Sequence, residues 1–269
     1  MKYLKELLKV FFWPVIFITG QFFIKYLFVI MYNNSKISYY QTLFPNFSDI
    51  EIINSIKYES GLNDYLNSNI FLITIVTFVF FGIIFVLKNK DNNFSKKLNI
   101  NIVIIIILLG IFISIFYNTL VYIINGVIHV TNNFNKNNVD IYILILSTGI
   151  LGPILEELLF RGIVYNKLLK FNNHKNAVII TSVIFSIMHF PNIINMFYTF
   201  LLSFLLLYLT DKYKLFSSII LHITINTTIV LFINFLILNN IFINTLILLF
   251  SIFSLVFLLK KLFSINRSV

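Results

Sequence analysis

Residues 141–165 read IYILILSTGILGPILEELLFRGIVY, an apolar run that carries two adjacent glutamates and an arginine near its end. A helix that crosses a lipid bilayer needs about 20 mainly apolar residues. The run is long enough, so it predicts a membrane-spanning helix with charged groups inside it. Charged side chains within a span are costly, and they usually face the protein interior or a water-filled cavity.

Similar runs recur along the chain, and the composition agrees with them. The 269 residues are 59% hydrophobic and only 11% charged, whereas a soluble domain carries about 25% charged residues. The sequence therefore excludes a soluble globular protein and predicts an all-α, polytopic membrane helix bundle of about eight transmembrane helices, with the lipid bilayer as its surroundings. These candidate spans lie at about 10–32, 70–87, 100–125, 141–165, 177–190, 193–209, 215–238 and 241–259.

The formal charge of +10 fits the same class of protein. Lysine and arginine collect on the cytoplasmic segments of multispanning proteins, so no nucleic-acid partner is expected. With a cytoplasmic amino terminus, sixteen of the twenty basic residues fall on the inner side. We therefore expect a multi-pass protein of the cell membrane with both termini in the cytoplasm. The richness in Ile, Phe, Asn and Lys is typical of an AT-rich bacterial genome.

Helix geometry separates the two acids in the charged stretch. Residues four apart lie on one helix face, so Glu157 is predicted to pair with Arg161. Glu156 is turned about 100° away and lacks that partner. It is free to meet water or substrate, or else it is an interfacial acid that faces lipid headgroups.

Polar residues within two further predicted spans are candidates for the same site. His189 lies near the end of the fifth span, and His222 and Asn226 share one face of the seventh. A glutamate beside histidines suits general-base activation of water, and histidine and asparagine donors suit an oxyanion. The same residue types could hold a divalent metal such as zinc. Spacing does not choose between these mechanisms, and no cofactor is favoured.

Other chemistries lack their residues or motifs. The chain has no cysteine, which excludes disulfides, Cys-ligated zinc and thiol nucleophiles. It has no His-Glu-x-x-His, no Gly-x-Ser-x-Gly and no Gly-rich phosphate loop. Soluble-type zinc proteases, serine hydrolases and nucleotide-driven proteins are therefore not indicated.

Three motifs together resemble the CPBP intramembrane proteases, also called the Abi family, which include the type II CAAX prenyl endopeptidases. The chain carries Glu156-Glu157-Leu158-Leu159-Phe160-Arg161, Phe185 to His189, and His222 to Asn226, in the family's order. The resemblance implies that Glu156 activates water with help from His189, and that Arg161 holds Glu157 as a supporting pair. It also implies that His222 and Asn226 stabilise the oxyanion. Both metal-dependent and glutamate-dependent mechanisms have been described for the family.

One membrane domain in three parts is expected from this resemblance. Residues 1–139 would form amino-terminal transmembrane helices with an external loop at 33–69, residues 140–230 the CPBP-like catalytic core, and residues 231–269 a carboxy-terminal transmembrane helix and cytoplasmic tail. The expected function is an intramembrane endopeptidase for a membrane-associated peptide or protein, with a cavity open to the cytoplasmic side. Bacteriocin self-immunity or peptide processing are roles associated with bacterial relatives.

Two other functions are compatible with the same residues. A non-catalytic membrane protein could bind a peptide and confer immunity without hydrolysis. A transporter could use the acid buried in the membrane, although the intramembrane charges are its only support. The sequence specifies neither the substrate and its cleavage site nor the oligomeric state.

Overall fold

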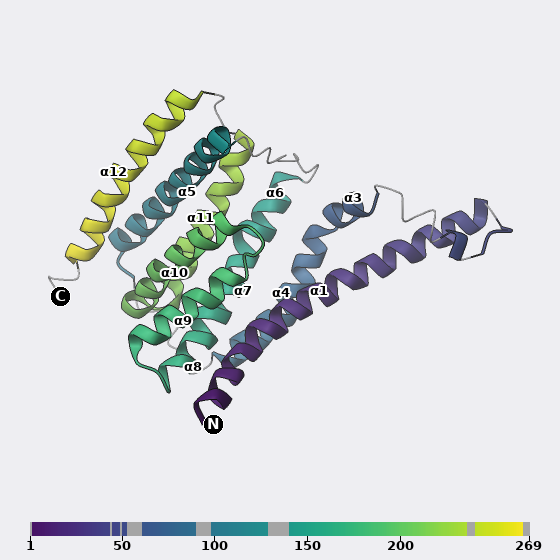
Figure 1. The fold of residues 1–269 in the computed structure, drawn as a ribbon, viewed down its shortest axis with the longest axis horizontal. Coiled ribbons are helices and arrows are strands. Elements are labelled where there is room, and N and C mark those ends of the chain that lie inside the picture. Colours follow the sequence, from purple (N-terminus) through teal and green to yellow (C-terminus); the bar gives the residue numbers. More distant parts are fainter. Residues whose placement is uncertain are drawn as a thin grey trace.

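A computed structural model describes residues 2–43, 45–48, 50–52, 61–89, 98–128, 140–235 and 240–265. Within these ranges the chain is helical and contains no strand (Figure 1). Each of the eight predicted spans corresponds to a helix or to one continuous helical run. The helices are α1 (Lys2–Leu43), α3 (Gly61–Ser68), α4 (Ile70–Lys88), α5 (Ile100–Ile128), α6 (Ile141–Leu144), α7 (Gly152–Glu157), α8 (Asn166–Leu169), α9 (His174–Ile187), α10 (Ile193–Tyr213), α11 (Leu215–Phe235) and α12 (Ile241–Ile265), together with the π-helical segments η1 (Ile145–Leu151) and η2 (Leu158–Tyr165).

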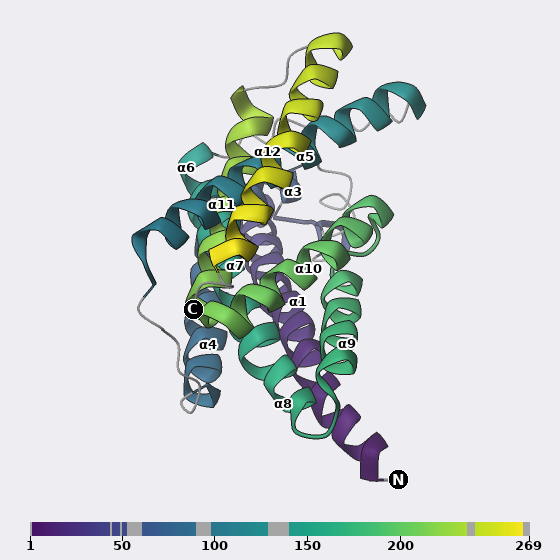
Figure 2. The ribbon, with the colours of Figure 1, turned by 90° about the vertical axis from the view of Figure 1, so that its left-hand side faces the viewer.

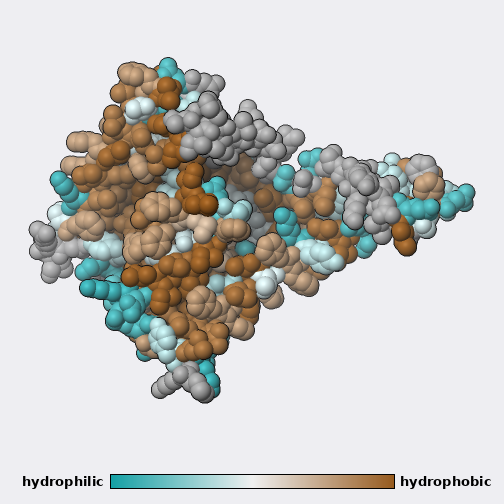
Figure 3. Space-filling model, in the orientation of Figure 1, coloured by the Kyte–Doolittle hydropathy of each residue, from teal (hydrophilic) through white to brown (hydrophobic). Residues whose placement is uncertain are grey.

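The predicted all-α polytopic membrane bundle is confirmed. Six helices of the described chain are long and apolar enough to cross a membrane: α1, α4, α5, the run from α6 to α8, α10 and α12. The helices α9 and α11 are apolar but shorter. Apolar side chains cover most of the visible face of the bundle in Figure 3, as a surface in contact with lipid tails requires.

The predicted external loop at 33–69 is wrong over much of its length. The helix α1 continues through the polar residues 33–36 and ends at Leu43, and α3 forms a further helix inside the predicted loop. Polar residues alone do not break a helix, whereas Pro45 disfavours helix in the residue before it. At about 1.5 Å per residue, the 42 residues of α1 exceed the bilayer core, and Figure 1 shows α1 running away from the bundle.

The run from Ile141 to Leu169 is one continuous helix with two widened segments. The segments η1 and η2 flank the six-residue α7, which carries both glutamates. Pro153 lies at the start of α7, where its missing N–H does least harm to the hydrogen-bond pattern. Segments of π-helix are rare and are frequent at functional sites. The charged stretch therefore lies in the most irregular part of the membrane bundle.

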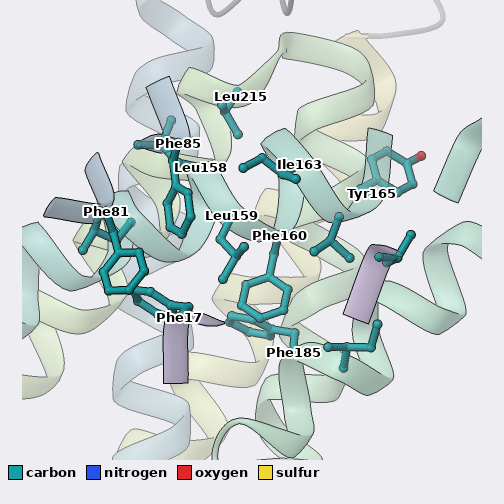
Figure 4. Packing of buried hydrophobic residues seen from close by; sticks show 14 of the residues in the cluster. Phe17, Phe81, Phe85, Leu158, Leu159, Phe160, Ile163, Tyr165, Phe185 and Leu215 are labelled. Carbon is teal, nitrogen blue, oxygen red and sulfur yellow. The ribbon is translucent and has the colours of Figure 1, made fainter. Parts of the chain in front are cut away.

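Two hydrophobic clusters hold this run in place. One cluster joins α1, α4, α7, η2 and α9, and it includes Phe17, Phe81 and Phe85 from the amino-terminal half (Figure 4). The other joins α5, α10, α11 and α12 around Ile106, Leu206 and Leu221. The run from Ile141 to Leu169 contributes residues to the first cluster, and α11 contributes residues to both. The two clusters are therefore joined through α11.

A close contact in the first cluster depends on Gly162. A Cβ atom at this position would overlap the side-chain amide of Asn89, which is fully buried. That amide donates to the carbonyl oxygen of Phe85 at 2.7 Å and to that of Leu158 at 3.1 Å. Glycine therefore lets α4 satisfy a backbone carbonyl of η2.

We expect Gly162→Ala to lower the melting temperature of the detergent-solubilised protein. The added methyl group must displace the Asn89 amide, and overpacking of this kind costs about 1 to 3 kcal/mol. Gly82→Ala is the matched control, because a Cβ atom there would meet Leu155 and Phe78 at an ordinary 3.8 Å. Equal melting temperatures for the two variants would contradict the role given to Gly162.

The basic ends of the helices lie on one side of the bundle. Lys88 and Lys167 both lie over the ring of Trp13, with Nζ atoms 5.8 and 5.0 Å from its centroid. His174 bonds Asp211 at 2.8 Å, which joins the start of α9 to the end of α10. The amino terminus and α8 lie low in both Figure 1 and Figure 2, whereas α6 lies high.

Candidate active site

A buried ion pair forms the base of the candidate site. Arg161 donates from Nη1 to Oε1 of Glu157 at 2.9 Å, and both side chains have no exposed surface. Its Nη2 donates to the hydroxyl oxygen of Ser203 at 3.0 Å, which links η2 to α10. The pairing expected from helix geometry is therefore present in the structure. If either charge were removed, the other would be left buried without a counter-charge, which is strongly destabilising.

The ring of Phe185 connects this ion pair to both histidines. The Arg161 guanidinium lies 4.4 Å from the Phe185 ring centroid, a cation–π contact. The same ring meets those of His189 and His222 edge-on, with centroids 5.1 and 6.0 Å apart. Phe185 is itself fully buried. One aromatic side chain thus contacts Arg161 of η2, His222 of α11 and His189 after the end of α9.

His222 lies between the two glutamates. Its Nδ1 is 2.8 Å from Oε1 of Glu157, and its Nε2 is 3.8 Å from Oε2 of Glu156. Because a carboxylate only accepts hydrogen bonds, Nδ1 carries a proton and donates it to Glu157. The 3.8 Å separation is too long for a hydrogen bond. The ring is therefore fixed by Glu157, and its second nitrogen is directed towards Glu156.

Glu156 differs from its neighbour in burial and in contacts. About a quarter of its side chain is exposed, at 26%, whereas the side chain of Glu157 is fully buried. The Oε2 atoms of both glutamates are buried without a hydrogen-bond partner, but Oε1 of Glu157 is bonded to Arg161 and only Glu156 keeps an exposed part. An unpaired buried carboxylate oxygen is costly. Such an atom is available to a water molecule or to a substrate.

His189 lies in the turn that follows α9. The helix α9 ends at Ile187, so it stops before His189, earlier than the span predicted at 177–190. Its Nδ1 is 3.0 Å from the carbonyl oxygen of Phe185. A carbonyl can only accept, so the proton is on Nδ1 and Nε2 keeps its lone pair in the neutral ring.

A cavity of about 350 Å³ brings three of the predicted residues together. His189, His222 and Asn226 all line it, although they come from α11 and from the turn after α9. The Asn226 amide nitrogen donates to the carbonyl oxygen of Thr148 in η1 at 3.2 Å. Glu156 is not among the lining residues and adjoins the cavity through His222. The remaining lining residues are Tyr117, Asn118, Val121, Thr148, Asn192, Asn195, Tyr198, Thr199, Leu202, Ile229 and Val230.

The cavity lies towards the end of the bundle away from Lys88 and Lys167, whereas the sequence led us to expect an opening on the cytoplasmic side. Its residues occupy the second half of α5, the middle and second half of α11, and the start of α10. These parts of the helices point away from Lys88 and Lys167.

The polar groups of the site do not form a metal cluster. Within the described ranges, no group of three or more His, Asp and Glu side chains is arranged to hold a metal ion. Nδ1 of His189 and Nδ1 of His222 each make a hydrogen bond, to the Phe185 carbonyl oxygen and to Glu157 respectively.

Comparisons with known proteins agree with the motifs. Residues 138–228 match the model of the family described as "Type II CAAX prenyl endopeptidase Rce1-like". All three motifs lie inside this CPBP segment, and the resemblance inferred from them is confirmed.

A relative among curated proteins covers a segment of similar length. It is described as "Putative membrane peptidase YdiL" of Bacillus subtilis (strain 168) and is 36% identical over 90 residues. The match covers 33% of this chain and 36% of the relative, so it spans about a third of each. No solved structure matches the chain.

Several residues of the site were not found from the sequence. Ser203 accepts a hydrogen bond from Arg161. Tyr117 and Tyr198 line the same cavity as the histidines, and the centroids of the two tyrosine rings are 4.1 Å apart. The serine and the tyrosines are ordinary residues of apolar helices, so their types carry no signal. Asn118, directly after Tyr117, could have indicated this part of the site, because its amide lies in the middle of an otherwise apolar run.

We expect Arg161→Met to destabilise the protein by about 3 to 5 kcal/mol, because it leaves the Glu157 carboxylate buried without its partner. The exposed pair of Lys9 and Glu6, at 2.7 Å, is the matched control. Lys9→Met should change stability by no more than about 0.5 kcal/mol. Thermal unfolding in detergent measures both, and similar losses in the two variants would contradict the structural role of the buried pair.

Proposed function

We propose that the protein is an intramembrane endopeptidase that hydrolyses a peptide bond of a membrane-associated peptide or protein. One observation carries the proposal. Glu156 has a buried carboxylate oxygen without a partner, and it adjoins a cavity lined by His189, His222 and Asn226. A base, a second proton acceptor and amide donors are the groups that hydrolysis of an amide requires. The family match supports the same class of reaction.

In the proposed reaction, the Glu156 carboxylate takes a proton from a water molecule, and the hydroxide attacks the carbonyl carbon of the peptide bond. Nε2 of His189 accepts a hydrogen bond from the same water, since Nδ1 is committed to the Phe185 carbonyl. The oxyanion accepts a hydrogen bond from the Asn226 amide, and one from His222 when Nε2 is also protonated. Glu156 then returns its proton to the leaving nitrogen as the carbon–nitrogen bond breaks.

The fixed groups around the site give this reaction its geometry. The buried pair of Glu157 and Arg161 holds the His222 ring from its Nδ1 side. Positioning of this kind lowers the entropic part of the barrier. We propose a metal-independent mechanism, since the described donors do not converge on a metal position. The biological role would be the processing of a peptide, or self-immunity against a bacteriocin.

We expect Glu156→Gln to lower turnover at least about 100-fold, because the amide cannot accept a proton from water. The assay uses the solubilised protein and a quenched peptide library with membrane-like segments. Asp64→Gln is a control for loss of an acid in α3, away from the site, and should leave turnover unchanged. Turnover that survives in Glu156→Gln would contradict the assignment of the base.

The same assay, repeated after a chelator has removed metal ions, tests whether turnover depends on a metal. Turnover kept after exhaustive chelation supports the glutamate mechanism, while loss that one specific divalent metal restores would assign the chemistry to that metal.

A further inference from the structure

Apart from its two histidines, the cavity is lined by uncharged side chains. It contains four asparagines, two tyrosines and two threonines, and no Asp, Glu, Lys or Arg. An ionised side chain that entered it would lose water without gaining a counter-charge, which is costly. Amides and hydroxyls both donate and accept hydrogen bonds, as the backbone of an extended peptide requires. The lining therefore suits a peptide segment with uncharged side chains.

One hydroxyl in this lining lacks a partner. The Oη atom of Tyr198 is buried and makes no hydrogen bond. Its ring is held against that of Tyr117, with an interplanar angle of 32°. A buried hydroxyl without a partner costs about 1 to 3 kcal/mol. A carbonyl oxygen of a bound peptide would remove that cost.

The cavity lies at the end of the bundle opposite the basic cluster. Asn192 caps α10 by accepting from the backbone N–H of Asn195, and both line the cavity. The other end of the same helix carries Lys212 and Lys214, and Lys88 and Lys167 meet Trp13 on that side. Basic residues mark the cytoplasmic side of a membrane protein. The asparagine end therefore faces outward.

We propose that the substrate enters this cavity from the outer side of the membrane, as an extended peptide segment with uncharged side chains, and that the Tyr198 hydroxyl binds its backbone. The substrate class is then a peptide outside the cytoplasm or in the outer leaflet. Tyr117, Asn118 and Val121 of α5 form one wall and lie outside the segment that matches the family. This inference rests on the proposed function for its substrate, but the side of access can be measured without turnover.

The absence of cysteine makes a labelling test direct. Asn192→Cys places a thiol at the cavity end, and Lys170→Cys places one at the basic end, and both positions are exposed. Intact cells are treated with a membrane-impermeant maleimide. We expect Cys labelling at position 192 in intact cells, and at position 170 only after the cells are permeabilised. The reverse pattern would overturn the outward access.

A second variant tests the tyrosine. Tyr198→Phe should raise KM about threefold to tenfold, with kcat nearly unchanged and no loss of thermal stability, because its hydroxyl has no partner in the free protein. The matched control is Tyr32→Phe, whose hydroxyl is also buried without a partner but lies in the cluster between α1 and α3. Unchanged KM in Tyr198→Phe would overturn the backbone contact.

The charge of the substrate is varied in the same assay. A peptide with Ala or Asn beside the cleaved bond should have a higher kcat/KM than the same peptide with Asp or Lys there, and equal values would overturn the uncharged class. If no peptide is cleaved by the wild type, the proposed function fails, while the labelling result still decides which side the cavity faces.

Discussion

The buried contact between Glu157 and Arg161 is the constraint on which the site depends. Neither charge is exposed, and the two are 2.9 Å apart. Separation of such a pair in a low-dielectric interior would be strongly destabilising, so the helix carrying it must keep its place. Ser203, Phe185 and His222 all contact the pair, and they bring α10, α9 and α11 to the same point. The part of the fold that carries the candidate site is thus organised around charge, within a bundle that apolar packing holds together.

Two adjacent glutamates acquire different chemistry from this arrangement. Glu157 points to the interior, and its Oε1 atom accepts hydrogen bonds from both Arg161 and His222. This atom therefore has a structural role. Glu156 is turned from the arginine by the helix, and 26% of its side chain is exposed. A single residue step along the helix therefore separates a supporting acid from a candidate base.

The candidate site combines residues from two sources. The acids, histidines and Asn226 all lie within the segment that matches the family. One wall of the cavity comes from α5, which lies outside that segment. In our proposal the shared segment supplies the reaction, and the amino-terminal half helps to determine which peptide reaches it. Such a division would allow related chains to keep the chemistry and differ in substrate.

The fold class and part of the site followed from local patterns. Each apolar run predicted as a span corresponds to a helix or a continuous helical run, six of them long enough to cross a membrane. The i, i+4 spacing predicted the ion pair, and both predictions depend only on neighbours along the chain. The structure departs from the predicted loop at 33–69, because polar residues alone do not end a helix and α1 continues to Leu43. The contact of His222 with Glu157 could not be predicted, because 65 residues separate them.

The sequence by itself determined that the chain is a helical membrane protein with a glutamate pair, two histidines and an asparagine in the order of one family. Periodicity, length and charge are properties of short stretches, and they can be obtained without the fold. Only the tertiary structure decided that the two histidines and the asparagine line one cavity, that His222 is bound by Glu157, and that Tyr117 and Tyr198 line the same cavity. Contacts between distant helices depend on their packing, and the position of the cavity opposite the lysines follows from that packing alone.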